Sequence, residues 1–162
     1  MSTFTLINNP LRFGKDTEKH PLAVTVYHLH NGLKKLRALN FHQGPSRTAF
    51  RPFYLWRGMK DMKVPADFEQ TGGSERGVMS TTSNTSVAAG YASKSEKGCP
   101  LFFRIKVQSP MDKGADVSWL SAYPGENEVI YPPLSFMQPL FKQELKGIEG
   151  GFAITMTVSF PS

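Results

Sequence analysis

Polar side chains interrupt three short stretches of this sequence that otherwise have the composition of β-strands. Arg57 ends an aromatic stretch in PFYLWRGM, Ser80 lies at the end of a strand pattern in RGVMSTTS, and Glu126 and Glu128 follow a Pro-Gly turn in YPGENEVIYPP. A guanidinium group can hold an anion with paired N–H donors. A carboxylate can stabilise positive charge or accept a proton. The three groups could therefore converge on one ligand cleft.

Each group taken alone also has an ordinary structural explanation. Arg57 could end an edge strand or pair with a carboxylate, the STT triplet could be a helix cap, and two glutamates after a turn could face solvent and protect a strand edge. Taken one at a time, the residues do not decide between a structural role and a place in a ligand cleft. The combination is more specific, because a strand-end arginine, a strand-end serine and a carboxylate pair occur in that order along one chain.

In this order, the segments LWRGM, GVMSTTSNTSVAAGYA and AYPGENEVIYPP resemble the Arg, Ser-Thr-Ser and Glu-x-Glu signatures of the arginine-serine-glutamate class of mono-ADP-ribosyltransferases. The resemblance covers roughly residues 24–133 and includes the helical pattern YHLHNGLKKLRALN upstream of the arginine. Thr82 stands where the family commonly has a second serine, although both side chains carry a hydroxyl group. The resemblance implies an enzyme that transfers ADP-ribose from its co-substrate NAD to a protein and releases nicotinamide.

The resemblance also implies roles for the residues of each signature. Glu128 is the expected catalytic carboxylate, which would stabilise the positive charge that develops on the sugar as the nicotinamide bond breaks. Ser80 is expected to hold that carboxylate or to bond the ribose, and Arg57 to anchor the NAD phosphates. The expected NAD contacts are completed by a glycine, two threonines and an aromatic ring: Gly58, Thr81, Thr82 and Tyr91.

Glu126 is expected to select the acceptor. Residues two apart in a strand face the same way, so Glu126 and Glu128 would both border the cleft. An arginine acceptor is protonated at neutral pH, and a second carboxylate can orient it and accept its proton. In the family, a glutamate at the first position goes with arginine acceptors, whereas a glutamine goes with asparagine or other acceptors. Tyr123, in the preceding turn, would contact the acceptor or simply lie on the surface.

Two other functions remain as alternatives. Water could replace the acceptor, which would make the protein an NAD glycohydrolase, favoured if the acceptor surface around Tyr123 is poorly formed. A non-catalytic module that binds NAD or nucleic acid through its net charge of +6 is the alternative from another class. The carboxylate pair argues against that module, because binding alone has no evident need for it, and we do not expect nucleic acid as a partner.

The pattern of apolar residues indicates the elements that position these groups. After a leader containing Pro and Gly, apolar residues at spacings of four and three predict an amphipathic helix from Pro21 to Asn40. Strand patterns follow at residues 52–59, 76–82 and 101–107, a short helix at 84–93, and a C-terminal hairpin that turns at GIEGG. This order predicts an α+β domain with a largely antiparallel sheet or sandwich. The resemblance implies the ADP-ribosyltransferase-like fold, an N-terminal helix with a mainly antiparallel two-sheet β core.

Length and composition predict one catalytic domain over residues 1–162, which we expect to be a monomer. We expect no membrane association, because no apolar run is long enough to cross a bilayer. A single cysteine, Cys99, suits the cytoplasm, although a secreted effector that uses a route without a recognisable signal would look the same. We expect no metal, since the chain has no HExxH motif, and His28 and His30 would point about 200° apart on a helix.

Overall fold

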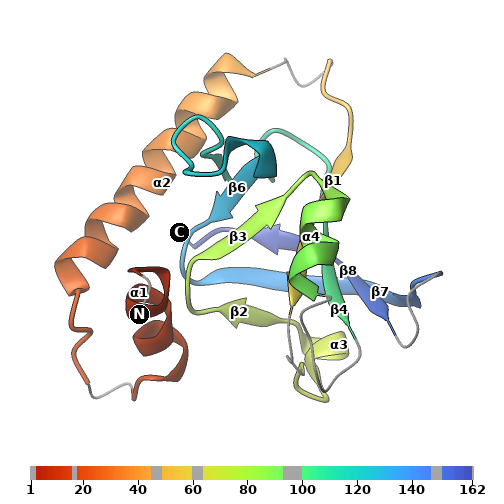
Figure 1. The fold of residues 1–162 in the computed structure, drawn as a ribbon, viewed down its shortest axis with the longest axis horizontal. Helices are drawn as coiled ribbons and strands as arrows, with labels where there is room; N and C mark the ends of the chain where they lie inside the picture. The colour runs from red at the N-terminus through yellow and green to blue at the C-terminus, as the bar shows by residue number, and fades with distance from the viewer. Residues whose placement is uncertain are drawn as a thin grey trace.

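Two helices near the N-terminus precede the strands of a sheet (Figure 1). The computed structural model describes residues 3–15, 18–44, 49–59, 64–92, 100–146 and 151–161. Its helices are α1 (Thr3–Phe13), α2 (Ala23–Gln43), α3 (Phe68–Thr71), α4 (Thr85–Ala92) and the 3-10 helix η1 (Pro124–Glu126). Its strands are β1 (Phe53–Met59), β2 (Gly73–Glu75), β3 (Met79–Thr82), β4 (Leu101–Val107), β5 (Ala115–Asp116), β6 (Glu128–Tyr131), β7 (Ser135–Glu144) and β8 (Phe152–Ser159). The predicted α+β class is confirmed.

The strands form one hydrogen-bonded sheet in the order β2-β7-β8-β4-β1-β3-β6-β5. Neighbouring strands run antiparallel, as predicted, except that β4 and β8 run parallel. The hairpin of β7 and β8 is present, although most of its predicted GIEGG turn lies outside the described residues. Cys99 also lies outside them.

The expected two-sheet core is present as two halves of this single sheet. Tyr131 of β6 and Phe160, just after β8, stack with ring centroids 5.5 Å apart, although four strand spacings, about 19 Å in a flat sheet, separate β6 from β8. The sheet must therefore fold over, so that both halves bury side chains in one core. That core includes Leu55, Met79, Ile105, Tyr131, Met137, Ile154 and Met156.

Helix α2 carries the apolar stripe that the sequence predicted. Leu33 is buried, and it packs in one cluster with Val78, Ala115 and Val117 from the sheet side. The other members of the stripe are partly buried against the same cluster: Leu22, Val26, Leu29 and Leu36. The helix begins at Ala23 and continues to Gln43, so the prediction that it ends at Asn40 was wrong by three residues.

Helix α1 was not predicted, because the sequence of residues 3–13 contains Pro10 and was interpreted as part of a leader. The structure shows a helix with Pro10 inside it. Ile7 is buried and Leu11 partly buried in the cluster around Leu33, so tertiary packing stabilises a segment whose local sequence is unfavourable. Figure 1 shows α1 and α2 on the same side of the sheet.

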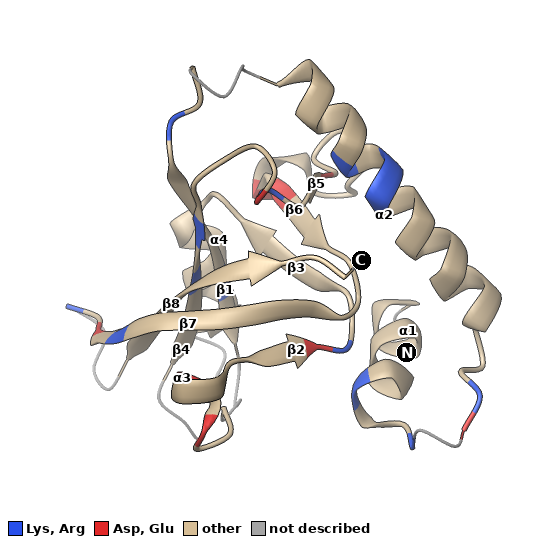
Figure 2. Ribbon diagram, turned by 180° about the vertical axis from the view of Figure 1, so that it is seen from behind, with Lys and Arg blue, Asp and Glu red and all other residues tan. Residues whose placement is uncertain are grey.

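The charged residues are spread over several elements (Figure 2). Lys34 and Lys35 of α2 are exposed, whereas Arg37 donates to the carbonyl oxygens of Lys113 and Met111. Among the described helices, none is long and apolar enough to cross a membrane. Within the same residues, no group of three or more His, Cys, Asp or Glu side chains could hold a metal ion.

Candidate active site

The pairing of β3 with β6 brings Ser80 to Glu128. Thr82 is the strand partner of Glu128, and Ser80 is the partner of Ile130, so Ser80 and Glu128 are diagonal neighbours on one face of the sheet. The Ser80 hydroxyl donates a hydrogen bond of 2.5 Å to Oε1 of Glu128. The hydroxyl of Ser121 lies 3.4 Å from Oε2. Two hydroxyl groups therefore hold the carboxylate in one orientation.

Glu126 borders the same cavity as Glu128, but for a different reason from the one predicted. Glu126 is the last residue of η1 and is not in a strand, and Asn127 between the two glutamates has a left-handed backbone with φ of 48°. The strand-periodicity argument was therefore wrong for this pair. The Thr82 hydroxyl donates to the carbonyl oxygen of Glu126, and the Tyr91 hydroxyl lies 3.4 Å from Oε1 of Glu126. A turn, not a strand, directs Glu126 toward the cavity.

Arg57 directly follows Trp56, the residue at which β1 pairs with β3, opposite Thr82. Its side chain is 14% exposed, and its Nη2 lies 3.8 Å from Oε2 of Glu75. Its Nη1 is buried and has no hydrogen-bond partner among the described residues. Burial lowers the pKa of Arg57 to about 10, and the charge of Glu75 opposes that effect. Arg57 is therefore cationic at neutral pH, with a donor left for an anionic ligand.

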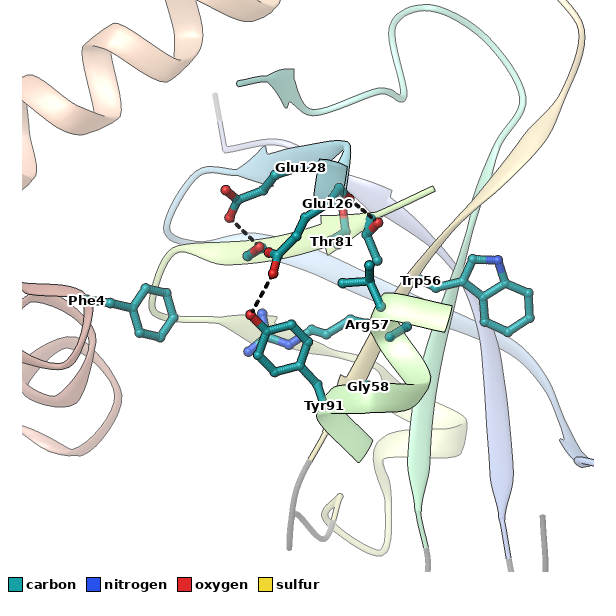
Figure 3. A pocket seen from close by; sticks show the side chains of 12 residues that line it. Phe4, Trp56, Arg57, Gly58, Thr81, Tyr91, Glu126 and Glu128 are labelled. Atoms are coloured by element: carbon teal, nitrogen blue, oxygen red, sulfur yellow. Dashed lines mark hydrogen bonds between the residues drawn. The ribbon is translucent and has the colours of Figure 1, made fainter. Parts of the chain in front are cut away.

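These side chains surround a cavity of about 310 Å³ (Figure 3). This volume lies at the lower end of the usual range for small-molecule sites, which is roughly 300–1,000 Å³. Every predicted site residue except Tyr123 lines it: Arg57, Gly58, Ser80, Thr81, Thr82, Tyr91, Glu126 and Glu128. Tyr123 is 70% exposed and does not belong to the lining.

Three of the predicted NAD contacts have structural partners of their own. The Thr81 hydroxyl donates to the carbonyl oxygen of Val129 at 2.7 Å, and the Thr82 hydroxyl bonds Glu126 and accepts the N–H of Asn84. A Cβ atom on Gly58 would lie 1.9 Å from the carbonyl oxygen of Ala88. Gly58 is thus required for the close approach of α4 to β1, not only for space beside a ligand.

The sequence reasoning missed Phe4 and Trp56, which also line the cavity together with Val87 and Ala88 of α4. Phe4 comes from α1, and Figure 3 shows its ring across the cavity from the ring of Tyr91. No local motif points to Phe4, because its place depends on the docking of an unpredicted helix. Trp56 directly precedes Arg57 in β1, and strand alternation places the two side chains on opposite faces, so the sequence pattern did not indicate Trp56 either.

The polar groups around the cavity influence one another. The pKa of Glu75 is lowered, because hydrogen bonds from Arg12 and Gly77 and the charge of Arg57 outweigh the opposing effect of burial. The pKa of Tyr91 is raised, first by its partial burial and then by the nearby carboxylate of Glu126. The Tyr91 phenol therefore stays protonated and can donate to Glu126. Together, the lining of the cavity combines the cationic guanidinium group of Arg57 with a pair of carboxylates.

The model of the ADP-ribosyltransferase exoenzyme family matches residues 2–138. A comparison with curated proteins finds no significant match.

Several solved structures share the fold. The ADP-ribosyltransferase HopU1 of Pseudomonas syringae pv. Tomato DC3000 aligns with a TM-score of 0.65 and 22% identity, over 94% of this chain and 63% of that one. Exoenzyme S of Pseudomonas aeruginosa, solved with human 14-3-3 protein beta and carba-NAD, aligns with a TM-score of 0.60 and 18% identity, over 93% and 64%. The C3 exoenzyme of Clostridium limosum aligns with a TM-score of 0.62 and 20% identity, over 96% and 78%. The chain thus spans less than two thirds of the length of the first two.

Proposed function

The chain belongs to the ADP-ribosyltransferase exoenzyme family, and from that premise we propose that it transfers ADP-ribose from NAD to an arginine side chain of a protein, with release of nicotinamide. The observation that carries this proposal is the 2.5 Å contact of Ser80 with Glu128 inside a cavity that Arg57 and Glu126 also line. A buried cation and an oriented carboxylate in the lining of one cavity suit a substrate with a phosphate group and a reactive sugar.

NAD fits the donor set of the cavity. When bound, NAD supplies the ADP-ribosyl group and nicotinamide as the leaving group. The unpartnered Nη1 of Arg57 can donate to a phosphate oxygen, which would remove the cost of burying that donor unpaired, about 1–3 kcal/mol. Carba-NAD occupies the related exoenzyme S, which supports NAD as the co-substrate here.

Glu128 is the proposed catalytic residue at the sugar. Its carboxylate would lie beneath the carbon that loses nicotinamide, where a fixed negative charge stabilises the developing positive charge more than it stabilises the ground state. Ser80 holds Oε1 of that carboxylate, so the charge does not have to reorient during the reaction. The orientation of Glu128 is therefore part of the proposed catalysis.

Glu126 is proposed to receive the acceptor. An arginine guanidinium carries a positive charge, and attack on the sugar requires loss of one of its protons. Glu126 lines the cavity beside Glu128 and could both orient the guanidinium and accept that proton. Tyr123 is exposed on the preceding turn and is available for contact with a protein surface. The carboxylate of Glu126 supports arginine as the acceptor, and the exposed Tyr123 supports a protein as its carrier.

The remaining parts of the proposal concern the protein as a whole. We place residues 1–162 in one catalytic domain that acts as a monomer on a protein substrate, without a metal. We place its action in the cytoplasm or, as the alternative, in a secreted effector, and the second is supported by structures of this fold that are named toxins or exoenzymes. Exoenzyme S was solved with a protein partner, which supports a protein as partner of this chain.

The direct test is incubation with labelled NAD and agmatine, an arginine-like acceptor. We expect labelled agmatine and free nicotinamide. Glu128→Gln should lower both products at least about 100-fold, as for other removals of transition-state electrostatics. Glu126→Gln should lose transfer to agmatine but retain nicotinamide release, because it lies outside the sugar chemistry. The exposed Glu144, at the end of β7, is a matched control, and Glu144→Gln should behave as the wild type.

Three results would contradict the proposal in different ways. Nicotinamide release without any labelled agmatine would indicate an NAD glycohydrolase. Binding to single-stranded nucleic acid with a steep salt dependence and no turnover of NAD would favour the non-catalytic module. Unchanged transfer by Glu126→Gln would remove the role of Glu126 while leaving that of Glu128 intact.

A further inference from the structure

Glu75, at the end of strand β2, lies between two arginines that come from distant parts of the chain. Arg12 of α1 binds it with a fork of two bonds, Nε to Oε1 at 2.9 Å and Nη2 to Oε2 at 3.0 Å. Nη2 of Arg57 lies 3.8 Å from Oε2. The side chains of Arg12, Glu75 and Arg57 are 19%, 12% and 14% exposed, so water screens the group only in part.

The backbone around Glu75 restricts it further. The N–H of Gly77 donates to Oε1 of Glu75 at 2.8 Å, so this oxygen has two donors. Arg12 also donates to the carbonyl oxygen of Val78 at 3.3 Å. Glu75 is therefore held in place before any contact with Arg57 is counted.

Helix α1 is fixed to the same segment through Asn8. This residue is buried, and its Oδ1 accepts the N–H of Val78 at 2.6 Å. A Cβ atom on Gly77 would lie 2.5 Å from that oxygen, so the glycine permits the close approach. Figure 2 shows the acidic end of β2 beside α1. Two side chains one helical turn apart, Asn8 and Arg12, thus attach α1 to the segment that leads into β3 and Ser80.

This arrangement limits how Arg57 can be satisfied. Arg12 occupies both oxygens of Glu75 in the fork geometry that a carboxylate favours. Arg57 therefore approaches through one nitrogen at a longer distance, and its Nη1 has no hydrogen-bond partner among the described residues. If Arg12 were absent, Glu75 could take the Arg57 fork itself and withdraw it from the cavity.

We propose that Glu75 is a positioning residue for the NAD pyrophosphate: it orients the guanidinium group of Arg57, and Arg12 of α1 holds Glu75 so that Arg57 keeps a donor for phosphate. This inference rests on the proposed function, since it needs NAD in the cavity. It assigns α1 a part in the binding site that the family signatures do not include.

Removal of the negative charge of Glu75 should change the affinity for an anionic ligand in opposite directions for two different roles of this residue. The three side chains carry one net positive charge, and Glu75→Gln would raise it to two. If Glu75 merely offset the arginines, the substitution would strengthen binding of an anionic ligand. If Glu75 positions Arg57, the same substitution weakens binding despite the additional positive charge.

The experiment measures the Kd of ADP-ribose, which keeps the pyrophosphate but cannot react, by titration calorimetry. We expect Glu75→Gln to raise Kd about tenfold, because Arg57 would lose the ion pair of 3.8 Å that orients it. In parallel, KM for NAD should rise by a similar factor while kcat for nicotinamide release changes by less than about twofold. Arg12→Lys keeps the charge but loses the fork, and we expect a Kd between those of the wild type and Arg12→Met.

A double-mutant cycle tests whether Arg12 acts through Glu75. If it does, Arg12→Met raises Kd in the wild type but has little further effect in Glu75→Gln. Equal effects in both backgrounds would mean that Arg12 contacts the ligand itself, which would overturn this role. The ion pair of Lys142 with Glu69, 2.8 Å apart and outside the cavity, is the control, and Glu69→Gln should leave Kd unchanged.

The outcomes separate this inference from the proposed function. If the wild type binds ADP-ribose and cleaves NAD, but Glu75→Gln leaves Kd unchanged or lowers it, the positioning role alone is wrong. If the wild type neither binds ADP-ribose nor cleaves NAD, both proposals fail. Melting temperatures of all variants well above the temperature of the titration would show that a change in Kd does not come from loss of the fold.

Discussion

At the scale of single residues, the orientation of Glu128 depends on hydroxyl groups. Within the described residues, its hydrogen bonds come from Ser80 and Ser121. A hydroxyl donor orients a carboxylate without cancelling its charge, whereas a lysine or arginine would do both. This leaves the negative charge of Glu128 available for a developing cation in the cavity.

Ser80→Ala tests this orientation. We expect kcat for nicotinamide release to fall about 10- to 100-fold, which corresponds to loss of a hydrogen bond to a charged group. The Kd of ADP-ribose should change little, because Arg57 and its ion pair with Glu75 stay intact. Ser121→Ala removes the longer contact of 3.4 Å and should lower kcat less. Equal kcat values for Ser80→Ala and the wild type would show that Ser80 does not orient Glu128.

At the scale of elements, the site depends on the contact between strand β1 and helix α4. Gly58 lies against the backbone of Ala88, and the same helix carries Tyr91 into the cavity. Ala88 and Ala92 are buried with Phe102 and Ala153 in a separate cluster beneath α4. Small side chains on the helix and a glycine on the strand let the two backbones approach, and this sets the position of the Tyr91 ring.

Gly58→Ala should disrupt this contact. The added methyl group would lie 1.9 Å from the carbonyl oxygen of Ala88, a backbone atom that cannot move without α4. We expect a loss of about 1–3 kcal/mol in the free energy of unfolding, typical of overpacking, measured by urea denaturation, and weaker binding of ADP-ribose.

Gly32→Ala is the matched control for this change. Gly32 is in α2, and its added methyl group would meet no atom within 4 Å. The same substitution there should stabilise the protein by about 0.5–1 kcal/mol through helix propensity. Stability of Gly58→Ala equal to that of the wild type would mean that α4 can shift freely on β1.

At the scale of the whole molecule, folding of the sheet brings separate parts of the chain to one site. Edge strand β2 supplies Glu75, and residues 76–78 lead directly to β3, which is five positions away from β2 in the strand order. Helix α1 packs against this connection, where Arg12 and Asn8 bind it. Charge pairs between distant segments therefore contribute to the global stability, and their contribution must depend on pH.

The pKa shifts of Glu75 and Asp116 predict the direction of that dependence. Both pKa values are lowered in the folded protein, Glu75 mainly by Arg12 and Asp116 mainly by Lys113, despite burial that acts the other way. The unfolded chain therefore binds more protons than the folded one at acidic pH. The stabilisation is fully present above the unfolded pKa values of 4.5 and 3.8, and it is lost as the pH falls through the lower folded values.

Urea denaturation at pH 7 and at pH 3 should show this loss as a smaller free energy of unfolding at pH 3. Glu75→Gln removes one of the two groups and should make the difference between the two pH values smaller than in the wild type. An identical difference in both proteins would show that the ion pairs of Glu75 do not stabilise the fold.

The sequence alone was sufficient for features that depend on local patterns. The stripe from Leu22 to Leu36 predicted α2, alternation predicted β1, and the order of Arg57, Ser80 and Glu128 predicted a shared site. The element predictions succeed because periodicity is a property of short segments. The prediction of a shared site succeeds because three short signatures occur in the order of a known family. The same reasoning failed for Glu126, where an αL residue at Asn127 replaces the expected strand.

Only the tertiary structure decided the rest. Residues 3–13 form a helix because Ile7 and Asn8 find partners in distant parts of the chain, although Pro10 makes the local sequence unfavourable. Arg12 and Glu75 are 63 residues apart, so nothing near either one indicates the other. Such contacts follow from the way the sheet folds over, and a global arrangement of this kind leaves no periodic pattern in the sequence from which it could be recognised.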